Sequence, residues 1–321
     1  MIRKLVILLI ALAVLAPACA WAEDAAPAVV DIGTVDWPLK QIRKYAEELP
    51  EGTVLAGQFT LLGQTWDIGA EEIDLDTAKG TLKREDLESL AAFMPNLKKV
   101  SLKTHTELMN NDIIPIVDAH PEITFVWTLR LRKYKIPTDV TAFSPKASDA
   151  DEPYLRSSDC QLLKYVPGLR ALDLGHQGSI TDLSFLDYFP ELRILILVDN
   201  RISDITPIGR LEHLQYLELF INPMIKDLSP LANCTELLDL NLSYTGFKSL
   251  QPLEACTKLE RFWCVFTKLT KAEKEAFIQA HPNCETLFLD EGGSTHGTWR
   301  KHPRFFQYRE MFDTGVWKEF E

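Results

Sequence analysis

The chain has 321 residues and a net charge of −12, with 46 acidic against 34 basic side chains. Nucleic acids and anionic membranes attract proteins through basic faces, so this balance argues against both as partners. The cysteines include no C-x-x-C pair, and this spacing predicts no zinc site.

The first residues predict a secretory signal peptide over residues 1–22. Arg3 and Lys4 precede an apolar run over residues 5–15, and Ala20-Trp21-Ala22 provides an A-x-A cleavage site. We expect cleavage after Ala22 and a secreted protein, whether extracellular, periplasmic or attached to the cell surface. A lipid anchor on Cys19 is the alternative. No later apolar run is long enough for a transmembrane segment.

The N-terminal third is predicted to contain a cap and longer repeats. Residues 23–69 are expected to form an N-terminal cap with a helix over residues 38–48, because Leu39, Ile42 and Tyr45 share one helical face. Residues 70–133 are expected to form helix-bearing repeats, with strands near residues 72–75, 97–102 and 123–126 and a helix over 83–93. Residues 134–160 break the repeat and are either an insertion or a degenerate repeat.

A repeat of 22 or 23 residues dominates residues 161–290. The pattern L-x-x-L-x-L begins at Leu169, Leu192, Leu214, Leu237 and Leu259. Each L-x-L triplet is a short strand with its leucines inward, and a single coil must stack on neighbours to bury them. The fold class is therefore an α/β solenoid, with a curved parallel sheet on the concave side and short helices or 3₁₀ turns on the convex side. A longer helix is expected over residues 271–280.

A polar residue follows each strand and is expected to bond backbone groups in the turn. These residues form a predicted structural ladder: Gln177, Asn200, Asn222, Thr245 and Thr267.

The repeat from Leu192 to Leu214, with Asn200, Ile202, Asp204 and Pro207, resembles the 22-residue class of leucine-rich repeats found in internalin-type bacterial surface proteins. The resemblance covers about residues 70–290. It implies a curved sheet that grips a protein ligand. The chain lacks a recognisable internalin head domain and wall-sorting end, so adhesion to host cells is not implied.

The outward strand positions should be solvated, yet many are aromatic or branched apolar residues, which is typical of a contact surface. The predicted ligand-binding residues of the concave face are Ile196, Tyr216, Glu218, Phe220, Asp239, Arg261, Trp263 and Phe266. We expect them to bind a protein or peptide. A glycan is the alternative, because aromatic rings edged by carboxylates also hold sugars. Covering by the C-terminal tail or by residues 134–157 is a further alternative.

Residues 291–321 are expected to fold back as an aromatic C-terminal cap. His296, Arg300, His302 and Arg304 cluster there, and a basic cap on an acidic body is preferred over an anion or metal site. No motif of a known catalytic site is present, so we predict no enzyme, no catalytic residue, no metal and no cofactor.

The remaining cysteines are expected to be buried thiols. Cys264 and Cys284 occupy core leucine positions of their repeats. Cys234 and Cys256 occupy equivalent places in adjacent coils, where a disulfide is the alternative to two thiols. The oligomeric state is left open.

Overall fold

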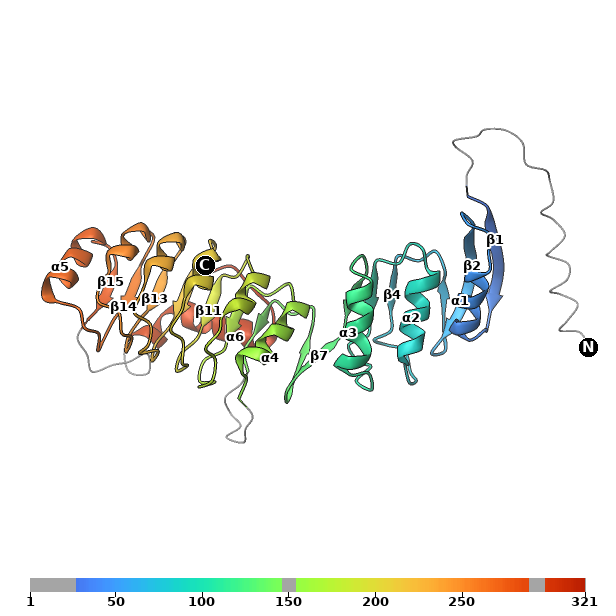
Figure 1. The fold of residues 1–321 in the computed structure, drawn as a ribbon, viewed down its shortest axis with the longest axis horizontal. Helices are drawn as coiled ribbons and strands as arrows, with labels where there is room; N and C mark the ends of the chain where they lie inside the picture. Colours follow the sequence, from blue (N-terminus) through green and yellow to red (C-terminus); the bar gives the residue numbers. More distant parts are fainter. Residues whose placement is uncertain (1–26, 146–153, 289–297, 321) are drawn as a thin grey trace, which may run out of the picture.

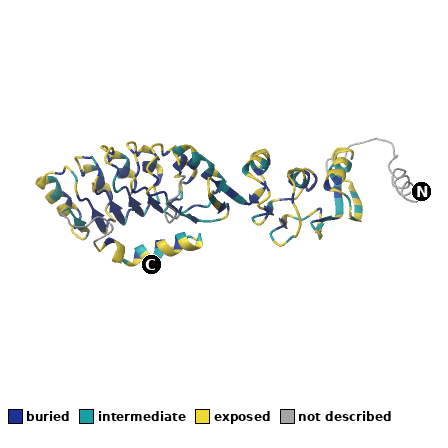
Figure 2. Cartoon of the chain, turned by 90° about the horizontal axis from the view of Figure 1, so that it is seen from below, coloured by how far each residue is buried: buried dark blue, intermediate teal, exposed yellow. Residues whose placement is uncertain are grey.

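The computed structural model describes residues 27–145, 154–288 and 298–320, and it is an elongated stack of coils (Figure 1). The predicted signal peptide, with Cys19, lies outside these residues. None of the helices in the described ranges combines the length and apolar character needed to cross a membrane. Seen from below, the convex turns, the strands and the C-terminal helix form successive layers (Figure 2).

The chain begins with a three-stranded sheet that carries one helix. Strand β1 (Val29–Val35) runs parallel to β2 (Val54–Leu61), and β2 turns back into β3 (Gln64–Asp67). Helix α1 (Leu39–Glu47) connects β1 to β2 and occupies the stretch where the sequence predicts a helix. Its buried residues, Leu39 and Ile42, lie on the predicted apolar face.

Three longer repeats follow and build a second parallel sheet. Strands β4 (Glu72–Asp74), β5 (Lys99–Ser101) and β6 (Thr124–Val126) pair in order. Helices α2 (Arg84–Phe93) and α3 (Asn110–Ala119) lie between them. The hydrophobic pattern does not predict α3, which contains Pro115, a residue that normally interrupts a helix.

The stretch that breaks the repeat contains a hairpin and a short strand. Strands β7 (Thr128–Leu131) and β8 (Tyr134–Pro137) pair antiparallel. Strand β9 (Ala142–Phe143) then pairs parallel with the first regular repeat strand, through Ala142 opposite Ala171. Beyond β9, Leu155 N donates a hydrogen bond to the Gln177 side chain, as part of a further coil. The described part of residues 134–160 therefore contributes a strand and a turn to the stack.

Seven parallel strands form the central sheet, in the order β15 to β9. After β9 they are β10 (Ala171–Asp173), β11 (Ile194–Ile196), β12 (Tyr216–Glu218), β13 (Asp239–Asn241), β14 (Arg261–Trp263) and β15 (Glu285–Leu287). The middle residues of β10 to β14 pair in register and are fully buried: Leu172, Leu195, Leu217, Leu240 and Phe262. The predicted fold class, a leucine-rich-repeat solenoid, is confirmed.

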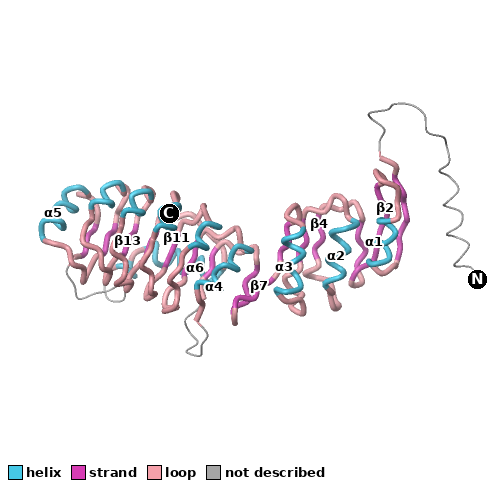
Figure 3. The backbone as a smooth tube through the Cα atoms, viewed as in Figure 1, coloured by secondary structure: helices cyan, strands magenta, loops and turns pink. Residues whose placement is uncertain are grey.

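Short helical turns return each coil on the convex side (Figure 3). They begin with α4 (Ser157–Cys160) and continue with η1 (Gln161–Tyr165), η2 (Ser184–Tyr188), η3 (Thr206–Arg210), η4 (Ser229–Asn233) and η5 (Gln251–Ala255), before α5 (Lys271–Ala280) closes the series. Proline occupies the first turn of η3, η4 and η5, where its missing N–H is not needed. The preceding aspartates accept from the turns, as Asp204 does from Thr206 N at 2.8 Å.

The ladder residues bond the backbone between coils. Asn222 is fully buried, and its Nδ2 donates to the carbonyls of Leu197 and Leu219 at 2.9 and 3.0 Å. Its Oδ1 accepts from Ile202 N at 3.1 Å. Thr267, in the last such turn, is only partly buried and donates to Cys264 O at 3.3 Å. The asparagines therefore join neighbouring coils, whereas Thr267 bonds only within its own turn.

All five cysteines of the described residues are free. The open question about Cys234 and Cys256 is answered in favour of two thiols, each bonded to the carbonyl of the preceding coil. Burial raises the pKa of Cys234 to about 12, so the thiol is unreactive at neutral pH.

Replacing Asn222 with alanine should destabilise the fold far more than replacing Thr267 with alanine. Asn222→Ala leaves three buried backbone groups without their partner, at about 3 kcal/mol, whereas Thr267→Ala removes one bond within a turn, at about 1 kcal/mol or less. Urea unfolding followed by circular dichroism measures both free energies. Equal losses in the two variants would contradict the inter-coil role of Asn222.

Candidate functional site

The C-terminal segment, residues 298–320, lies across the concave face of the central sheet (Figures 1 and 2). It contains η6 (Trp299–Lys301) and α6 (Pro303–Thr314). A second hydrophobic cluster, separate from the leucine core of the coils, fills the space between sheet and segment. It includes Tyr216 and Trp263 from the strands and Trp299, Tyr308 and Met311 from the segment.

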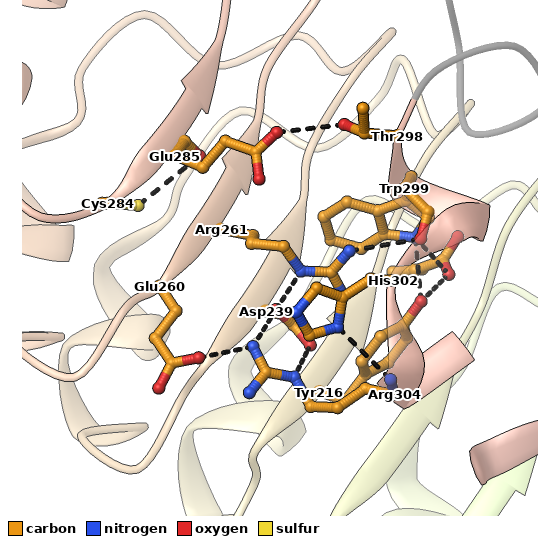
Figure 4. A network of polar contacts seen from close by, with 11 residues as sticks. Tyr216, Asp239, Glu260, Arg261, Cys284, Glu285, Thr298, Trp299, His302 and Arg304 are labelled. Atoms are coloured by element: carbon orange, nitrogen blue, oxygen red, sulfur yellow. Dashed lines mark hydrogen bonds and ion pairs between the residues drawn. The ribbon is translucent and has the colours of Figure 1, made fainter. Parts of the chain in front are cut away.

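A buried carboxylate holds the segment to the sheet (Figure 4). Asp239 of β13 is fully buried and accepts from Arg261 Nε of the next strand at 2.7 Å. From the segment, Arg304 donates to both Asp239 oxygens, at 2.6 and 3.0 Å. A further bond joins Arg304 to Glu260 at 2.7 Å. Hydrogen bonding and charge from Asp239 and Glu260 raise the pKa of Arg304 against the opposing effect of burial.

Trp299 inserts beside this ion network. Its Nε1 donates to Tyr216 Oη at 2.8 Å and to Glu218 Oε1 at 2.9 Å. The Arg261 guanidinium lies over its indole ring, 4.5 Å from the ring centroid. A buried ring of this size removes roughly 150–250 Å² from water, which contributes about 4–6 kcal/mol at ~25 cal/mol per Å². Ring burial therefore stabilises the docked segment, and the ion network fixes its position.

The other end of the segment is attached to β9. Gly315 ends α6 in the left-handed region, with a φ of 73°. Its carbonyl accepts from Thr141 N at 2.9 Å, and Trp317 N donates to Thr141 Oγ1 at 2.6 Å. The segment therefore spans the concave face from β14 to β9 and is held at both ends.

This arrangement corrects the expectation that the outward strand positions are solvated. Six of the eight predicted ligand-binding residues are buried in the structure: Ile196, Tyr216, Glu218, Asp239, Arg261 and Trp263. The C-terminal segment covers them, and it forms hydrogen bonds with four of them directly through Trp299 and Arg304. The aromatic and basic composition of the tail is a signal that it packs on the body of the protein, and covering of the concave face by the tail is the alternative stated above.

The other two predicted residues, Phe220 and Phe266, remain accessible in an aromatic row with Tyr244. The three rings come from successive coils, with centroids 5.3 Å apart for Phe220 and Tyr244 and 4.5 Å apart for Tyr244 and Phe266. Phe266 is 60% exposed and Tyr244 39% exposed. Both have positive φ, 53° and 56°, a conformation that aromatic residues rarely adopt.

A cavity of about 420 Å³ lies between the sheet and α6. Asp173 and Glu218 line its sheet side, and Phe305, Tyr308 and Phe312 line its helix side. Burial raises the pKa of both carboxyl groups, and the charge of Asp173 raises that of Glu218 further. Of these five residues, only Glu218 belongs to the predicted binding set.

The tail cluster does not form a metal site in the described residues. No group of three or more histidine, cysteine or acidic side chains there is placed to hold a metal ion. Arg304 binds Asp239 instead, and burial together with the nearby Arg261 and Arg304 lowers the pKa of His302. His296 lies outside the described residues.

Loss of the Arg304 guanidinium should loosen the C-terminal segment. Arg304→Ala leaves the buried Asp239 with one arginine in place of two, at a cost of about 3 kcal/mol in the free energy of unfolding. Lys318→Ala, which removes an exposed ion pair with Glu310, should cost at most about 0.5 kcal/mol. Urea unfolding and the rate of trypsin cleavage within residues 298–320 report both effects. Equal cleavage rates in the two variants would argue against the ion network.

Glu218→Gln should stabilise the protein increasingly as pH rises. Because burial raises the pKa of Glu218 above its usual value of 4.5, the folded protein holds this proton more tightly than the unfolded chain. Ionisation therefore costs stability above pH 4.5, and the cost grows until pH passes the raised value. Glutamine keeps an oxygen for Tyr216 and Trp299 and has no charge to bury. The difference in unfolding free energy between variant and parent should be larger at about pH 7 than at about pH 4; a constant difference would contradict the assignment.

Comparison with known proteins agrees with the repeat geometry. The leucine-rich-repeat family model that describes two copies of the repeat matches residues 190–233. No curated protein matches the sequence. Among solved structures, internalin C2 from Listeria monocytogenes is 18% identical, with 80% of this chain and 88% of that chain covered and a TM-score of 0.35.

Two further structures are similar at the same level. A leucine-rich-repeat protein of Leptospira interrogans is 17% identical, covering 80% of this chain and 64% of its own, with a TM-score of 0.41. The Arabidopsis receptor kinase HAESA, solved with the peptide hormone IDA and the co-receptor SERK1, is 16% identical over 69% of this chain and 34% of the receptor, with a TM-score of 0.35. This chain therefore spans less than two thirds of either protein. Residues 190–233 carry the leucine-rich repeat, and the register of strands β10 to β14 extends the same unit through the central sheet.

Proposed function

We propose that this protein is a secreted binding module that engages a protein partner through the aromatic row, Phe220, Tyr244 and Phe266. Leucine-rich-repeat domains are generally protein-interaction modules, and this fold is typically a non-enzymatic scaffold. The observation that carries the proposal is the exposure of Tyr244 and Phe266, with the half-buried Phe220 beside them. The three rings contact one another at the end of the strands, beside a concave face that is already occupied.

The backbone at and beside the row supports a role beyond stability. Residues 176, 199, 221, 244 and 266 have φ values of 53–59° at equivalent positions of five coils, and the last three, Ile221, Tyr244 and Phe266, are large and apolar. Such a conformation costs about 1–3 kcal/mol for each residue of this type, and glycine or asparagine would avoid most of the cost. The chain thus keeps large apolar side chains at positions where smaller residues would be more stable. Partner contact is a physical reason to keep them.

The buried members of the predicted set have an indirect role in this proposal. Asp239, Arg261 and Trp263 fix the C-terminal segment beside the row, so the row is presented by a rigid surface. The partner is expected to be neutral or basic at its contact face, because the chain carries a net charge of −12.

Secretion is part of the same proposal. It is supported by the charged start, apolar run and A-x-A site over residues 1–22. Removal of this leader also removes Arg3 and Lys4, which makes the remaining chain more acidic.

The double variant Phe220→Ser with Phe266→Ser should lose partner binding. Removal of two central aromatic contacts costs about 2 kcal/mol or more, which corresponds to at least a tenfold weaker complex. Residues 23–321 are immobilised, incubated with the extracellular fraction of a host culture and crosslinked. Binding is measured as the recovery of each captured protein by the variant relative to the parent chain.

The matched control is Phe306→Ser on α6, because Phe306 is as exposed as Phe266, at 61%, and lies outside the row. A captured protein supports the proposal if the control retains it and the double variant does not. If the double variant captures the same proteins as the parent chain, the row is not the contact surface.

A further inference from the structure

The cavity between the central sheet and α6 has the size and the lining of a small-ligand site. Its volume, about 420 Å³, lies within the ~300–1,000 Å³ of small-molecule pockets. The sheet side combines the carboxyl groups of Asp173 and Glu218 with the apolar Ile196 and Val198. Exposed residues, including His176, also line the cavity, so it opens to solvent.

The two carboxyl groups stand at matching positions on strands β10 and β12. Asp173 pairs with Ile196, and Ile196 pairs with Glu218, so the carboxylates flank one isoleucine. Strands lie about 4.8 Å apart, which places their Cα atoms about 10 Å from each other. Asp173 accepts from Gly175 N at 2.8 Å and from Ser144 Oγ at 2.9 Å. These bonds fix the orientation of the Asp173 carboxylate.

Glu218 presents one carboxylate oxygen to the cavity. Its Oε1 accepts both from Tyr216 Oη and from Trp299 Nε1, and no hydrogen bond to Oε2 is present among the described residues. The side chain is nevertheless buried. A buried carboxylate without an ion pair is costly, and glutamine would keep both hydrogen bonds at this position without a buried charge. Its presence indicates a group selected for contact with something that enters the cavity.

The opposite side of the cavity supplies hydrogen-bond donors around an aromatic ring. The guanidinium groups of Arg300 and Arg309 lie 5.8 and 5.9 Å from the centroid of Phe305, and both residues are exposed at the cavity. Within the described ranges, neither arginine pairs with a carboxylate. The lining therefore has acceptors on the sheet side, the two arginines and the acidic Asp313 on the helix side, and an apolar strip between them.

These features point to a neutral ligand with many hydroxyl groups. The two arginines would repel a simple cation, and the two carboxylates would repel a simple anion. A purely apolar ligand would leave both sets of charged groups without water or partners. A hydroxyl group both donates and accepts, so it can serve either side of the cavity.

We propose that this cavity binds a neutral sugar of about one or two rings. Hydroxyl groups on one edge of the sugar donate to Asp173 and to Glu218 Oε2. Hydroxyl groups on the other edge accept from Arg300 and Arg309. The C–H face of the ring packs on Phe305. The site is independent of the proposed protein-binding row, because Phe220, Tyr244 and Phe266 do not line the cavity.

Isothermal titration calorimetry of residues 23–321 tests the proposal with defined probes. The sugars are D-glucose, D-galactose, D-mannose, N-acetyl-D-glucosamine and maltose. The competing classes are represented by L-alanine as a zwitterion, putrescine as a cation and inorganic phosphate as an anion. At least one sugar should bind saturably with a dissociation constant of about 1 mM or tighter.

Two conservative variants and one control locate the binding. Asp173→Asn and Glu218→Gln each replace a charged acceptor with a neutral one and should weaken sugar binding about tenfold. Glu212→Gln, an exposed carboxylate that does not line the cavity, should leave the affinity unchanged. Thermal unfolding verifies that each variant is folded. If one cavity variant does not fold, the other is sufficient for the comparison. Absence of binding by every sugar, binding of another probe class alone, or sugar binding unaffected by both cavity variants would overturn the proposal.

Discussion

The arrangement of the whole concave side depends on one buried carboxylate that is shared by two arginines. Asp239 receives Arg261 from the neighbouring coil and Arg304 from the C-terminal segment. A buried carboxylate with a single partner would be poorly compensated, and a second guanidinium supplies the remaining donors. This requirement makes the position of the segment specific, since only Arg304 reaches both Asp239 oxygens from α6. The rings of Trp299 and Tyr308 then pack against the strands in the second hydrophobic cluster.

Because the C-terminal segment covers the concave face, only part of the curved sheet remains accessible to a partner. The described residues form two hydrophobic clusters, one inside the coils and one between sheet and segment, and the second uses the side chains that would otherwise face solvent. Two features remain available at its borders. The aromatic row is accessible at the end of the strands, and the cavity beneath α6 is partly enclosed and combines charged groups with apolar side chains. An apolar outer surface suits a macromolecule, whereas a recess of mixed lining suits a small ligand.

The free-energy cost of burying a carboxylate distinguishes the structural acidic residue of this face from those that line the cavity. Asp239 is buried together with its cationic partners, and its cost is offset by four hydrogen bonds and ion pairs in the same network. Glu218 is buried and Asp173 is half-buried; both have hydrogen-bond donors but no ion pair among the described residues, and desolvation raises the pKa of both. Groups that reduce stability in this way are typical of functional sites. The contrast distinguishes the cavity from the ion network that lies a short distance along the same sheet.

The sequence by itself determined the features that repeat. The spacing of Leu195, Leu217 and Leu240 predicts the register of the strands, and the polar residue that follows each strand predicts a polar ladder, because both are local patterns that recur with every coil. The hairpin of β7 and β8 escaped prediction for a local reason, since its left-handed turn residue is Arg132 rather than glycine or asparagine.

Only the tertiary structure decided where the tail lies and which strand residues stay exposed. Trp299 bonds Tyr216 across 83 residues, and Arg304 bonds Asp239 across 65. No periodicity links such partners, and the composition of the tail shows that it must be buried without showing against which surface. The concave face, the open end of the stack and the convex turns all expose apolar groups that aromatic rings could cover. The choice among them depends on the three-dimensional fit of one arginine to one carboxylate, which a linear pattern does not contain.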